Sequence, residues 1–305
     1  MKKLTSLILA LMMCVGMLVS VAAPISAAKF TDVADGQWYT EAVAWAAENE
    51  AHKKDVHIVN NGLNLYGEYY DFGYDKCVFV GTKAEESGIL QGEMIGEYVR
   101  DNFSAVDING DGEISYILFK GEEGNAEAIA RTQFGVEDAD AVLTAAGKAP
   151  LEYFDAQAAQ KWQTDPEGAW SAKAAKDYMD TNLVTFNESN GNMIELVICN
   201  NDGMAEGVVA SLQAAGYNAA GQHIVPVFGV DATDAAKALI AEGSMIGTVK
   251  QDANGMAVAI CETVKAIAGG KTPVDALASL TDERLTVAGD CAGKLYVSYA
   301  PYTGE

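Results

Sequence analysis

Apolar and polar positions alternate along the chain in two kinds of block. From residue 56 onward, short runs of consecutive apolar residues are followed by longer segments whose apolar residues recur every three or four positions. The first kind predicts buried strands and the second predicts amphipathic helices. The predicted strands are 56–59, 77–80, 116–119, 194–199, 225–230 and 247–249, and the predicted helices are 85–98, 126–134, 171–183, 204–215, 232–241 and 253–268. Because these strands are apolar throughout, they predict an α/β fold with parallel sheets flanked by helices.

Polar residues follow most of the predicted strands. They are Asn60, the segment 120–131, the segment 200–202, Asp231, and the pair Gln251 and Asp252. In parallel α/β folds, ligands bind beyond the carboxyl ends of the strands. We therefore expect a ligand site built from these positions.

An oxygen-rich loop lies at 107–115, with the sequence Asp-Ile-Asn-Gly-Asp-Gly-Glu-Ile-Ser. Oxygen-bearing side chains at its first, third and fifth positions, with Gly112 at the sixth, are the pattern of an EF-hand-type calcium loop. Position 12 should be a bidentate Glu but is Leu118, inside a predicted strand. A calcium site here needs a carboxylate from elsewhere in the chain. The alternative is a turn that binds no metal.

The N-terminus has the composition of an export signal. Lys2 and Lys3 precede an apolar run at 7–23 and then small residues at 26–28. This pattern predicts a cleaved signal peptide at 1–28 rather than a membrane span. No small residue stands just before Cys14, so we expect no lipid anchor. The mature protein is expected to be periplasmic or extracellular, including the cell surface.

Charge and histidine content exclude several classes of function. The formal charge is −23, and loss of the two signal lysines makes it about −25, which repels nucleic acid and anionic lipid. The three histidines lie in no recognised metal or nucleophile motif, and no Ser/His/Asp set is evident. We therefore predict no enzyme. A glycosidase-like carboxylate pair, Glu127 with Asp231, is the weaker alternative.

Several short motifs resemble one family. They are Val-Phe-Val-Gly-Thr at 78–82, Glu-Ser-Gly-Ile-Leu-Gln-Gly at 86–92, the loop at 107–115, Lys-Gly-Glu at 120–122, Ala-Arg-Thr at 130–132, Glu-Leu-Val-Ile-Cys-Asn-Asn-Asp at 195–202 and Pro-Val-Phe-Gly-Val-Asp-Ala at 226–232. From about residue 55 onward the chain resembles the galactose/glucose-binding proteins of ABC sugar importers. The resemblance implies a two-lobed periplasmic-binding-protein-like I fold that closes over D-galactose or D-glucose and docks on ABC permease subunits.

The resemblance also implies a complete calcium site. In that family the loop takes its bidentate Glu from a later strand, and the matching residue is Glu195. The implied Ca²⁺ ligands are Asp107, Asn109, Asp111, the backbone carbonyl of Glu113, Ser115 and Glu195. Sodium or magnesium remains an alternative ion.

A sugar site is implied in part. Sugar binding needs planar polar groups that hydrogen-bond hydroxyls and an aromatic ring against the apolar face of the pyranose. The matching positions are Asn60, Arg131, Asn201 and Asp231, with Trp170 as the stacking ring; Asn125, Glu127 and Gln251 also match, but stand where the family has His, Asp and Asn. The preferred sugar therefore stays open. The alternatives are a surface ion pair for Arg131, a core position for Trp170 and a helix cap for Asp231.

The N-terminal region departs from the family pattern. Only residues 29–55 separate the expected signal peptide from the first predicted strand, too few for the three strand–helix units expected there. Residues 29–51 instead resemble the opening half of an S-layer homology motif. We therefore expect an incomplete lobe 1 at 52–106 and 250–284, and a lobe 2 with the calcium loop at 107–249 and 285–305.

Two functions follow from this organisation. The first is an exported sugar-binding protein for an ABC importer, impaired by the loss of most of lobe 1 and binding sugar weakly or not at all. The alternative is a cell-surface-associated or non-functional calcium-stabilised fragment without a transport role. An exposed sheet edge in lobe 1 would favour a dimer, and the 29–51 segment would allow weak cell-wall contact.

Overall fold

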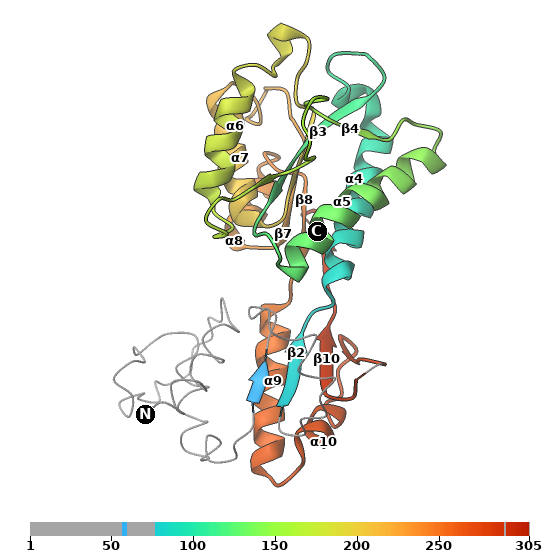
Figure 1. Cartoon of the computed structure of the whole chain (residues 1–305), viewed down its shortest axis with the longest axis vertical. Helices are drawn as coiled ribbons and strands as arrows, with labels where there is room; N and C mark the ends of the chain where they lie inside the picture. The colour runs from blue at the N-terminus through green and yellow to red at the C-terminus, as the bar shows by residue number, and fades with distance from the viewer. Residues whose placement is uncertain (1–56, 60–76, 290, 305) are drawn as a thin grey trace, which may run out of the picture. The chain divides into compact units, whose positions relative to one another are not determined.

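The computed structural model describes residues 57–59, 77–289 and 291–304. The expected signal peptide, the S-layer-like segment and Asn60 lie outside the described residues. The chain divides into two compact units (Figure 1), of which unit 1 comprises residues 1–83 with 252–298 and unit 2 comprises residues 84–251 with 299–305. No helix within the described ranges is long and apolar enough to cross a membrane.

Unit 1 contains a small mixed sheet. Its strand order is β1-β2-β10-β9, with β9 antiparallel to β10 and the other pairs parallel. The elements are β1 (His57–Val59), β2 (Cys77–Gly81), α9 (Ala253–Ala268), α10 (Pro273–Ala278), β9 (Leu285–Val287) and β10 (Lys294–Val297). Apolar side chains of β2 and β10, including Val78, Val80 and Leu295, form one core with Met256 and Ile260 of α9. The apolar run of each strand is thus covered by the apolar stripe of α9.

Unit 2 contains a seven-stranded sheet. Its order is β11-β8-β7-β6-β3-β4, with β5 also pairing with β3. The strands are β3 (Ile114–Lys120), β4 (Leu151–Tyr153), β5 (Gln163–Thr164), β6 (Leu196–Cys199), β7 (Val227–Asp231), β8 (Gly247–Lys250) and β11 (Ala300–Tyr302). Every pair is parallel except β11 with β8. The carboxyl ends of the parallel strands therefore meet at one edge.

Helices cover both faces of this sheet, as its non-alternating apolar strands predicted. They are α4 (Ala84–Val106), α5 (Ala126–Ala145), α6 (Ala172–Leu183), α7 (Asp202–Ala214) and α8 (Asp234–Ala241), with a 3-10 turn at Glu188–Asn190. Figure 1 shows α6, α7 and α8 on one side of the sheet and α4 and α5 on the other. Each side has its own core, with Met204 and Val208 in the first and Ile95 and Leu143 in the second.

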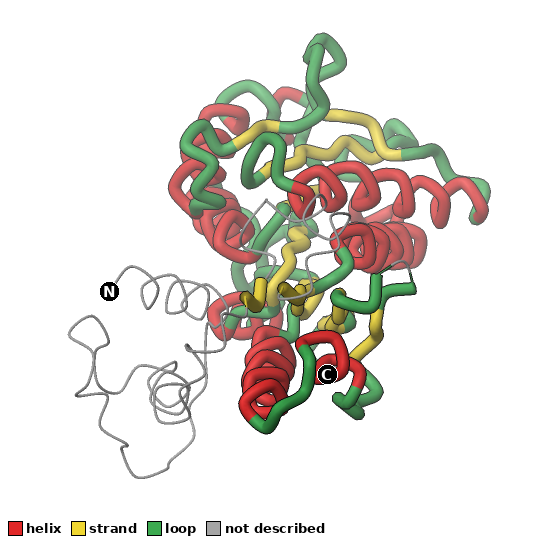
Figure 2. The backbone as a smooth tube through the Cα atoms, turned by 60° about the horizontal axis from the view of Figure 1, so that its bottom comes forward, coloured by secondary structure: helices red, strands yellow, loops and turns green. Residues whose placement is uncertain are grey.

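Helices α4 and α5 pack against each other over several turns. Both belong to the helices that cover one face of the large sheet, which Figure 2 draws in red. Gly88, Gly92 and Gly96 of α4 recur every four residues and face α5. A Cβ added at these positions would lie 2.5 Å from the Ala130 carbonyl oxygen, 2.5 Å from the Phe134 carbonyl oxygen and 2.6 Å from the Val142 Cβ, respectively. Because real Cβ atoms do not approach that closely, the three glycines allow the two backbones to come together.

The observed division of the chain differs from the expected lobes at three places, the smallest of which is residues 250–251, expected in lobe 1 but found in unit 2. The helix predicted at 85–98 extends to Val106 and belongs to unit 2, because its apolar stripe packs on α5 and the large sheet rather than on the small one. Strands β9 and β10 belong to unit 1, since β10 pairs with β2. Of the segment expected at 285–305 in lobe 2, only 299–305 lies in unit 2.

Candidate functional site

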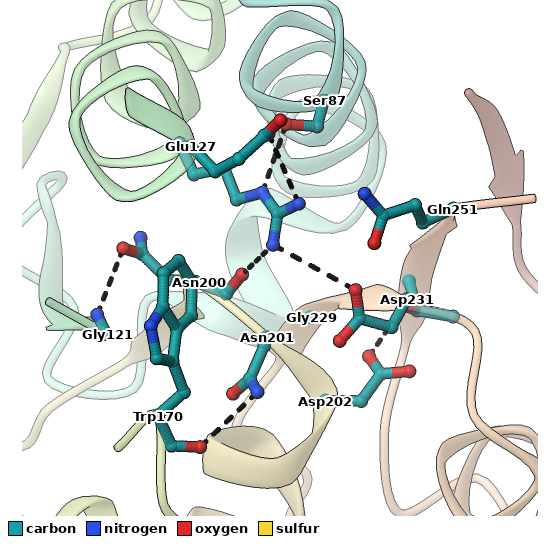
Figure 3. Close-up of polar contacts among 12 residues, drawn as sticks. Ser87, Gly121, Glu127, Trp170, Asn200, Asn201, Asp202, Gly229, Asp231 and Gln251 are labelled. Carbon is teal, nitrogen blue, oxygen red and sulfur yellow. Dashed lines mark hydrogen bonds and ion pairs between the residues drawn. The ribbon is translucent and has the colours of Figure 1, made fainter. Parts of the chain in front are cut away.

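Polar side chains gather in unit 2 where β6, β7 and β8 end and α5 and α7 begin (Figure 3). We call this set the Arg131 cluster; it consists of Ser87, Glu127, Arg131, Trp170, Asp231, Gln251 and Tyr299. All seven residues belong to the same unit. The cluster lies at the carboxyl edge of the parallel strands, where the sequence predicted a ligand site.

Arg131 is the centre of this cluster. It lies on α5, and only 3% of the residue is exposed, so it is not a surface ion-pair residue. Its Nε donates to the Ser87 hydroxyl at 3.1 Å, its Nη1 to the Asn200 carbonyl at 2.8 Å and its Nη2 to the Tyr299 hydroxyl at 3.1 Å. These bonds come from α4, the end of β6 and the C-terminal segment. They fix the plane of the guanidinium.

Two carboxylates flank the guanidinium of Arg131. Its Nη2 lies 3.4 Å from Glu127 Oε2, and its Nη1 lies 4.0 Å from Asp231 Oδ1. Burial by itself would lower the pKa of Arg131, but Tyr299, Glu127 and Asp231 outweigh it and raise that pKa. The site therefore holds a permanent cation between two acidic groups.

Asp231 is the last residue of β7 and adopts an unusual backbone conformation. Its φ is +123°, and that of Ala232 is +55°, values that L-residues rarely adopt. Burial raises the pKa of Asp231 to about 6, against the lowering effect of Arg131. The side chain is still 32% exposed. The N-cap of α8 is Thr233, so Asp231 is not the helix cap that was its alternative role.

Trp170 places an aromatic ring beside the guanidinium. Arg131 Cζ lies 5.7 Å from the ring centroid, and the ring covers Gly121 so closely that any Cβ there would clash with it. Trp170 itself has φ +55° and is half-buried, outside the apolar core clusters of unit 2. Its position fits a stacking platform better than a core residue.

The three predicted amide residues that lie in the described part of the chain take different positions. Asn201 caps α7, with Oδ1 accepting from Met204 N at 3.0 Å and Nδ2 donating to the Trp170 carbonyl at 3.3 Å. Asn125 caps α5 by accepting from the backbone N–H groups of its second and third residues. Gln251 donates to the Tyr299 hydroxyl at 3.2 Å. The structure thus places Gln251 in the cluster and gives the two asparagines helix-capping roles.

Sequence reasoning missed Tyr299 as a site residue. The buried hydroxyl accepts from Arg131 and Gln251 and donates to Glu127 Oε2 at 3.0 Å. It lies 168 residues from Arg131 in the chain, beyond the last of the motifs that carried the family resemblance. Ser87 lay inside a motif that carried the family resemblance, but no site role was predicted for it.

The loop at 107–115, which we call the acidic loop, is organised by its own carboxylates. Asp107 accepts from the backbone N–H groups of Gly110 at 2.7 Å and Gly112 at 3.0 Å. Asp111 accepts from the N–H of Glu113 at 2.9 Å and from the side-chain amide of Asn109 at 2.9 Å. These short-range bonds make the sharp turn that the sequence pattern predicted.

Glu195 reaches the acidic loop from the segment before β6, as the resemblance implied. Its Oε1 accepts from Ile108 N at 2.8 Å and Asn109 N at 3.2 Å, and its Oε2 accepts from Ser115 N at 2.9 Å and from the Ser115 hydroxyl at 3.2 Å. Burial raises the pKa of Glu195.

All six predicted metal ligands are therefore in or against one loop. Carboxylate, amide, hydroxyl and backbone oxygens are the donors that Ca²⁺ prefers. However, within the described residues no three His, Cys, Asp or Glu side chains converge closely enough to hold a metal. The donor chemistry fits calcium, whereas the side-chain positions are those of a hydrogen-bonded loop.

The fold and the site together define an α/β protein that can hold a polar ligand against an arginine, two carboxylates and an aromatic ring. The chain belongs to the periplasmic binding protein domain family, whose model matches residues 40–272. Proteins of this family bind ligands for transport and do not transform them, so the prediction that the chain is not an enzyme is confirmed. Membership also implies an exported protein.

The chain is also similar in sequence to individual known proteins. This chain is 35% identical over 202 residues to the D-galactose/methyl-galactoside binding periplasmic protein of Haemophilus influenzae, and the match covers 66% of this chain and 54% of that protein. The chain spans about half the length of the curated relatives it matches.

Two solved structures share the fold. An ABC transporter solute binding protein from Clostridium phytofermentans with bound β-D-glucose has a TM-score of 0.58 at 19% identity, covering 84% of this chain and 71% of that one. A solute binding protein from Bacillus halodurans with bound myo-inositol has a TM-score of 0.55 at 22% identity, covering 87% and 79%. The predicted periplasmic-binding-protein-like α/β fold is thereby confirmed.

Proposed function

We propose that this chain binds a monosaccharide for an ABC importer, with D-galactose and D-glucose as the first candidates. The observation that carries the proposal is the Arg131 cluster, in which a fixed guanidinium, two carboxylates and a half-buried tryptophan ring lie together. The H. influenzae relative, named for D-galactose and methyl-galactoside, supports the choice of sugar. Myo-inositol in one structural relative widens the set of polyols to test.

The geometry suggests how a hydroxyl would be held. The 4.0 Å from Arg131 Nη1 to Asp231 Oδ1 is too long for a direct hydrogen bond. A sugar hydroxyl between them would accept from the guanidinium and donate to the carboxylate, and both bonds would be charge-assisted. The Trp170 ring offers an apolar surface for the C–H face of the same sugar. One hydroxyl and one ring face would thus be recognised together.

We further propose that the acidic loop binds Ca²⁺ through Asp107, Asn109, Asp111, the carbonyl of Glu113, Ser115 and Glu195. When bound, the ion would supply positive charge that neutralises the carboxylates and fixes the loop. This chain's own contribution is to bring Glu195 from the segment before β6 against a turn 80 residues earlier. Export through a signal peptide at 1–28 and docking on permease subunits complete the proposed transport role.

Calorimetric titration of the full chain with D-galactose, D-glucose and myo-inositol, each in calcium and in chelator, tests the proposed function. Because lobe 1 is expected to be incomplete, we expect weak but saturable binding of at least one sugar, lost in Trp170→Ala and retained in Trp162→Ala, a matched tryptophan outside the cluster. Binding of none of the three would contradict a sugar-import role and favour a calcium-stabilised fragment without transport function. A melting temperature unaffected by chelator would contradict the calcium site.

A further inference from the structure

The connection between β7 and α8 is held in a strained conformation. Asp231 and Ala232, with φ of +123° and +55°, are consecutive non-glycine residues in a region that favours glycine. Such conformations persist only where the surrounding structure enforces them. The residues that enforce this one therefore control where the Asp231 carboxylate lies.

Two side chains hold the backbone just after Asp231. Asp202 Oδ2 accepts from the Thr233 backbone N–H at 2.7 Å, and Thr248 Oγ1 accepts from the Ala232 N–H at 3.3 Å. The Thr248 hydroxyl in turn donates to Asp202 Oδ1 at 2.6 Å. The backbone N–H groups of Ala232 and Thr233 are thus both bound by one hydrogen-bonded pair of side chains. We call this pair the Asp202–Thr248 clamp. Figure 3 shows Asp202 beside Asp231.

Burial of the Asp202 carboxyl group carries a cost in stability. The residue is fully buried, and the donors named above are neutral, so within the described part of the chain its carboxyl group has no ion pair to offset burial. Burial raises the pKa of Asp202 to about 7. The sheet also accommodates this group, because a Cβ at Gly229 of β7 would collide with Asp202 Oδ1. Strand β7 thus leaves room at Gly229 for the buried Asp202 carboxyl group.

We propose that Asp202 and Thr248 are positioning residues, which hold the 231–233 turn so that the Asp231 carboxylate faces Arg131. The link to sugar binding rests on the proposed function, whereas the clamp itself does not. Asp202 contacts the turn from the start of α7 and Thr248 contacts it from β8, so the two act on Asp231 from different elements. Their effect on ligand affinity must therefore pass through Asp231.

Amide hydrogen exchange tests the clamp without any ligand. In Asp202→Ala and in Thr248→Val we expect the Ala232 and Thr233 amide protons to exchange about tenfold faster than in wild type, since each variant removes an acceptor from the turn. Thr248→Ser keeps the hydroxyl and should restore slow exchange. Ser211→Ala is the matched control, because its buried hydroxyl also starts from α7 but bonds to Asp180 Oδ1 at 2.6 Å. Unchanged exchange at both amides in both clamp variants would overturn the clamp.

A double-mutant cycle on sugar affinity tests the second part. Asp202→Ala alone should weaken binding about tenfold, yet add little in an Asp231→Asn background, because the clamp acts only through Asp231. Additive losses would overturn the positioning role and indicate a general structural defect. If wild type binds none of the sugars, the proposed function fails while the exchange experiment still decides the clamp.

Discussion

The Arg131 cluster and the acidic loop are both polar assemblies of unit 2, but they are held together in opposite ways. In the loop, the carboxylates of Asp107 and Asp111 bond backbone groups two to five residues away, and the distant partners, Glu195 and the Met193 carbonyl, come from one segment. In the cluster, the contacts of Arg131 to Ser87, Asn200 and Tyr299 span 44, 69 and 168 residues. The loop is a local structure with one long-range tie, whereas the cluster depends on the whole unit.

This difference predicts how strongly a substitution in each assembly should affect stability and ligand binding. Removing one group from the cluster leaves charges without partners in a buried place, because each group serves several others. Removing one group from the loop disturbs a turn that its remaining short-range bonds still support. Energetic effects should therefore be larger, and more coupled to ligand binding, in the cluster.

Arg131→Met should have the largest effect. It keeps most of the side-chain length but leaves the carboxylates of Glu127 and Asp231 without their cation, so we expect the free energy of unfolding to fall by about 3–5 kcal/mol. Urea unfolding measures this change. The control is Lys173→Met, whose pair with Asp177 is exposed, and which should change stability by less than about 0.5 kcal/mol. If the free energy of unfolding fell equally in the two variants, the buried charge of Arg131 would contribute no more to stability than an exposed one, which would contradict the prediction.

Tyr299→Phe should come next. It removes only the hydroxyl that connects Arg131, Gln251 and Glu127, and hydrogen bonds to charged groups contribute about 2 kcal/mol. We expect that loss in urea unfolding, together with weaker sugar binding. Tyr217→Phe is the matched control, since among the described residues its hydroxyl bonds only Glu188, with Oε2 at 3.4 Å. Full retention of sugar affinity in Tyr299→Phe would show that the hydroxyl does not organise the site.

Glu195→Gln should destabilise the acidic loop by about 1–2 kcal/mol in chelator, because one carboxylate oxygen becomes an amide donor facing backbone N–H groups. It should also abolish any stabilisation by calcium. Sugar affinity should not change, since the loop and the cluster share no hydrogen bond among the contacts described. Parallel calcium titrations and sugar titrations measure both outcomes. A matching loss of sugar affinity would show that the two assemblies are coupled.

The pH dependence of sugar binding should follow Asp231, whose pKa is about 6. At pH 5 only about a tenth of the carboxyl groups are ionised, so affinity should be about tenfold lower than at pH 8. Stability runs in the opposite direction: this raised pKa contributes to the free energy of unfolding at low pH, and the contribution is lost as the pH rises through about 6. Calorimetry at both pH values, with Asp231→Asn as a flat control, measures the effect. The same pH dependence in the variant would assign it to another group.

Asn125→Ala should have the smallest effect and tests its assignment as a helix cap. Loss of the cap should lower the free energy of unfolding by about 1 kcal/mol and leave sugar affinity unchanged. Asn125→Ser, which can still cap α5, should recover the stability. If both variants weaken sugar binding tenfold or more, Asn125 contacts the ligand after all.

The sequence predicted those features that short segments encode by themselves. The apolar strands and the periodic helices fixed the α/β class, and helix 253–268 has the predicted bounds because its apolar stripe ends at a Gly pair. The acidic loop was visible because its ligand pattern is contiguous. Glu195 was found only through the family resemblance, since nothing near it in the chain indicates a loop 80 residues earlier.

Features that depend on the choice of packing partner could not be predicted. The apolar stripe of α4 fits either sheet, so its periodicity alone did not assign it to unit 2. The pairing of β10 with β2 could not be predicted either, because the apolar residues of β10 do not indicate which strand lies beside them. Tyr299 was missed because a hydroxyl becomes a site group only when remote donors and acceptors converge on it. Arg131 and Asp231 were predicted as site residues. The 4.0 Å distance between Arg131 Nη1 and Asp231 Oδ1 could not be predicted, because it depends on how the helices pack on the sheet.

The glycines of α4 set a dimension of the site without touching it. Ser87 lies on α4 and Arg131 on α5, so the 3.1 Å bond between them is a measure of how far apart the two helices lie. Gly88, next to Ser87, allows the closest approach there, and Gly92 and Gly96 keep the same spacing further along. Because these three residues have no side chains, α4 and α5 can lie close enough for Ser87 to hydrogen-bond Arg131.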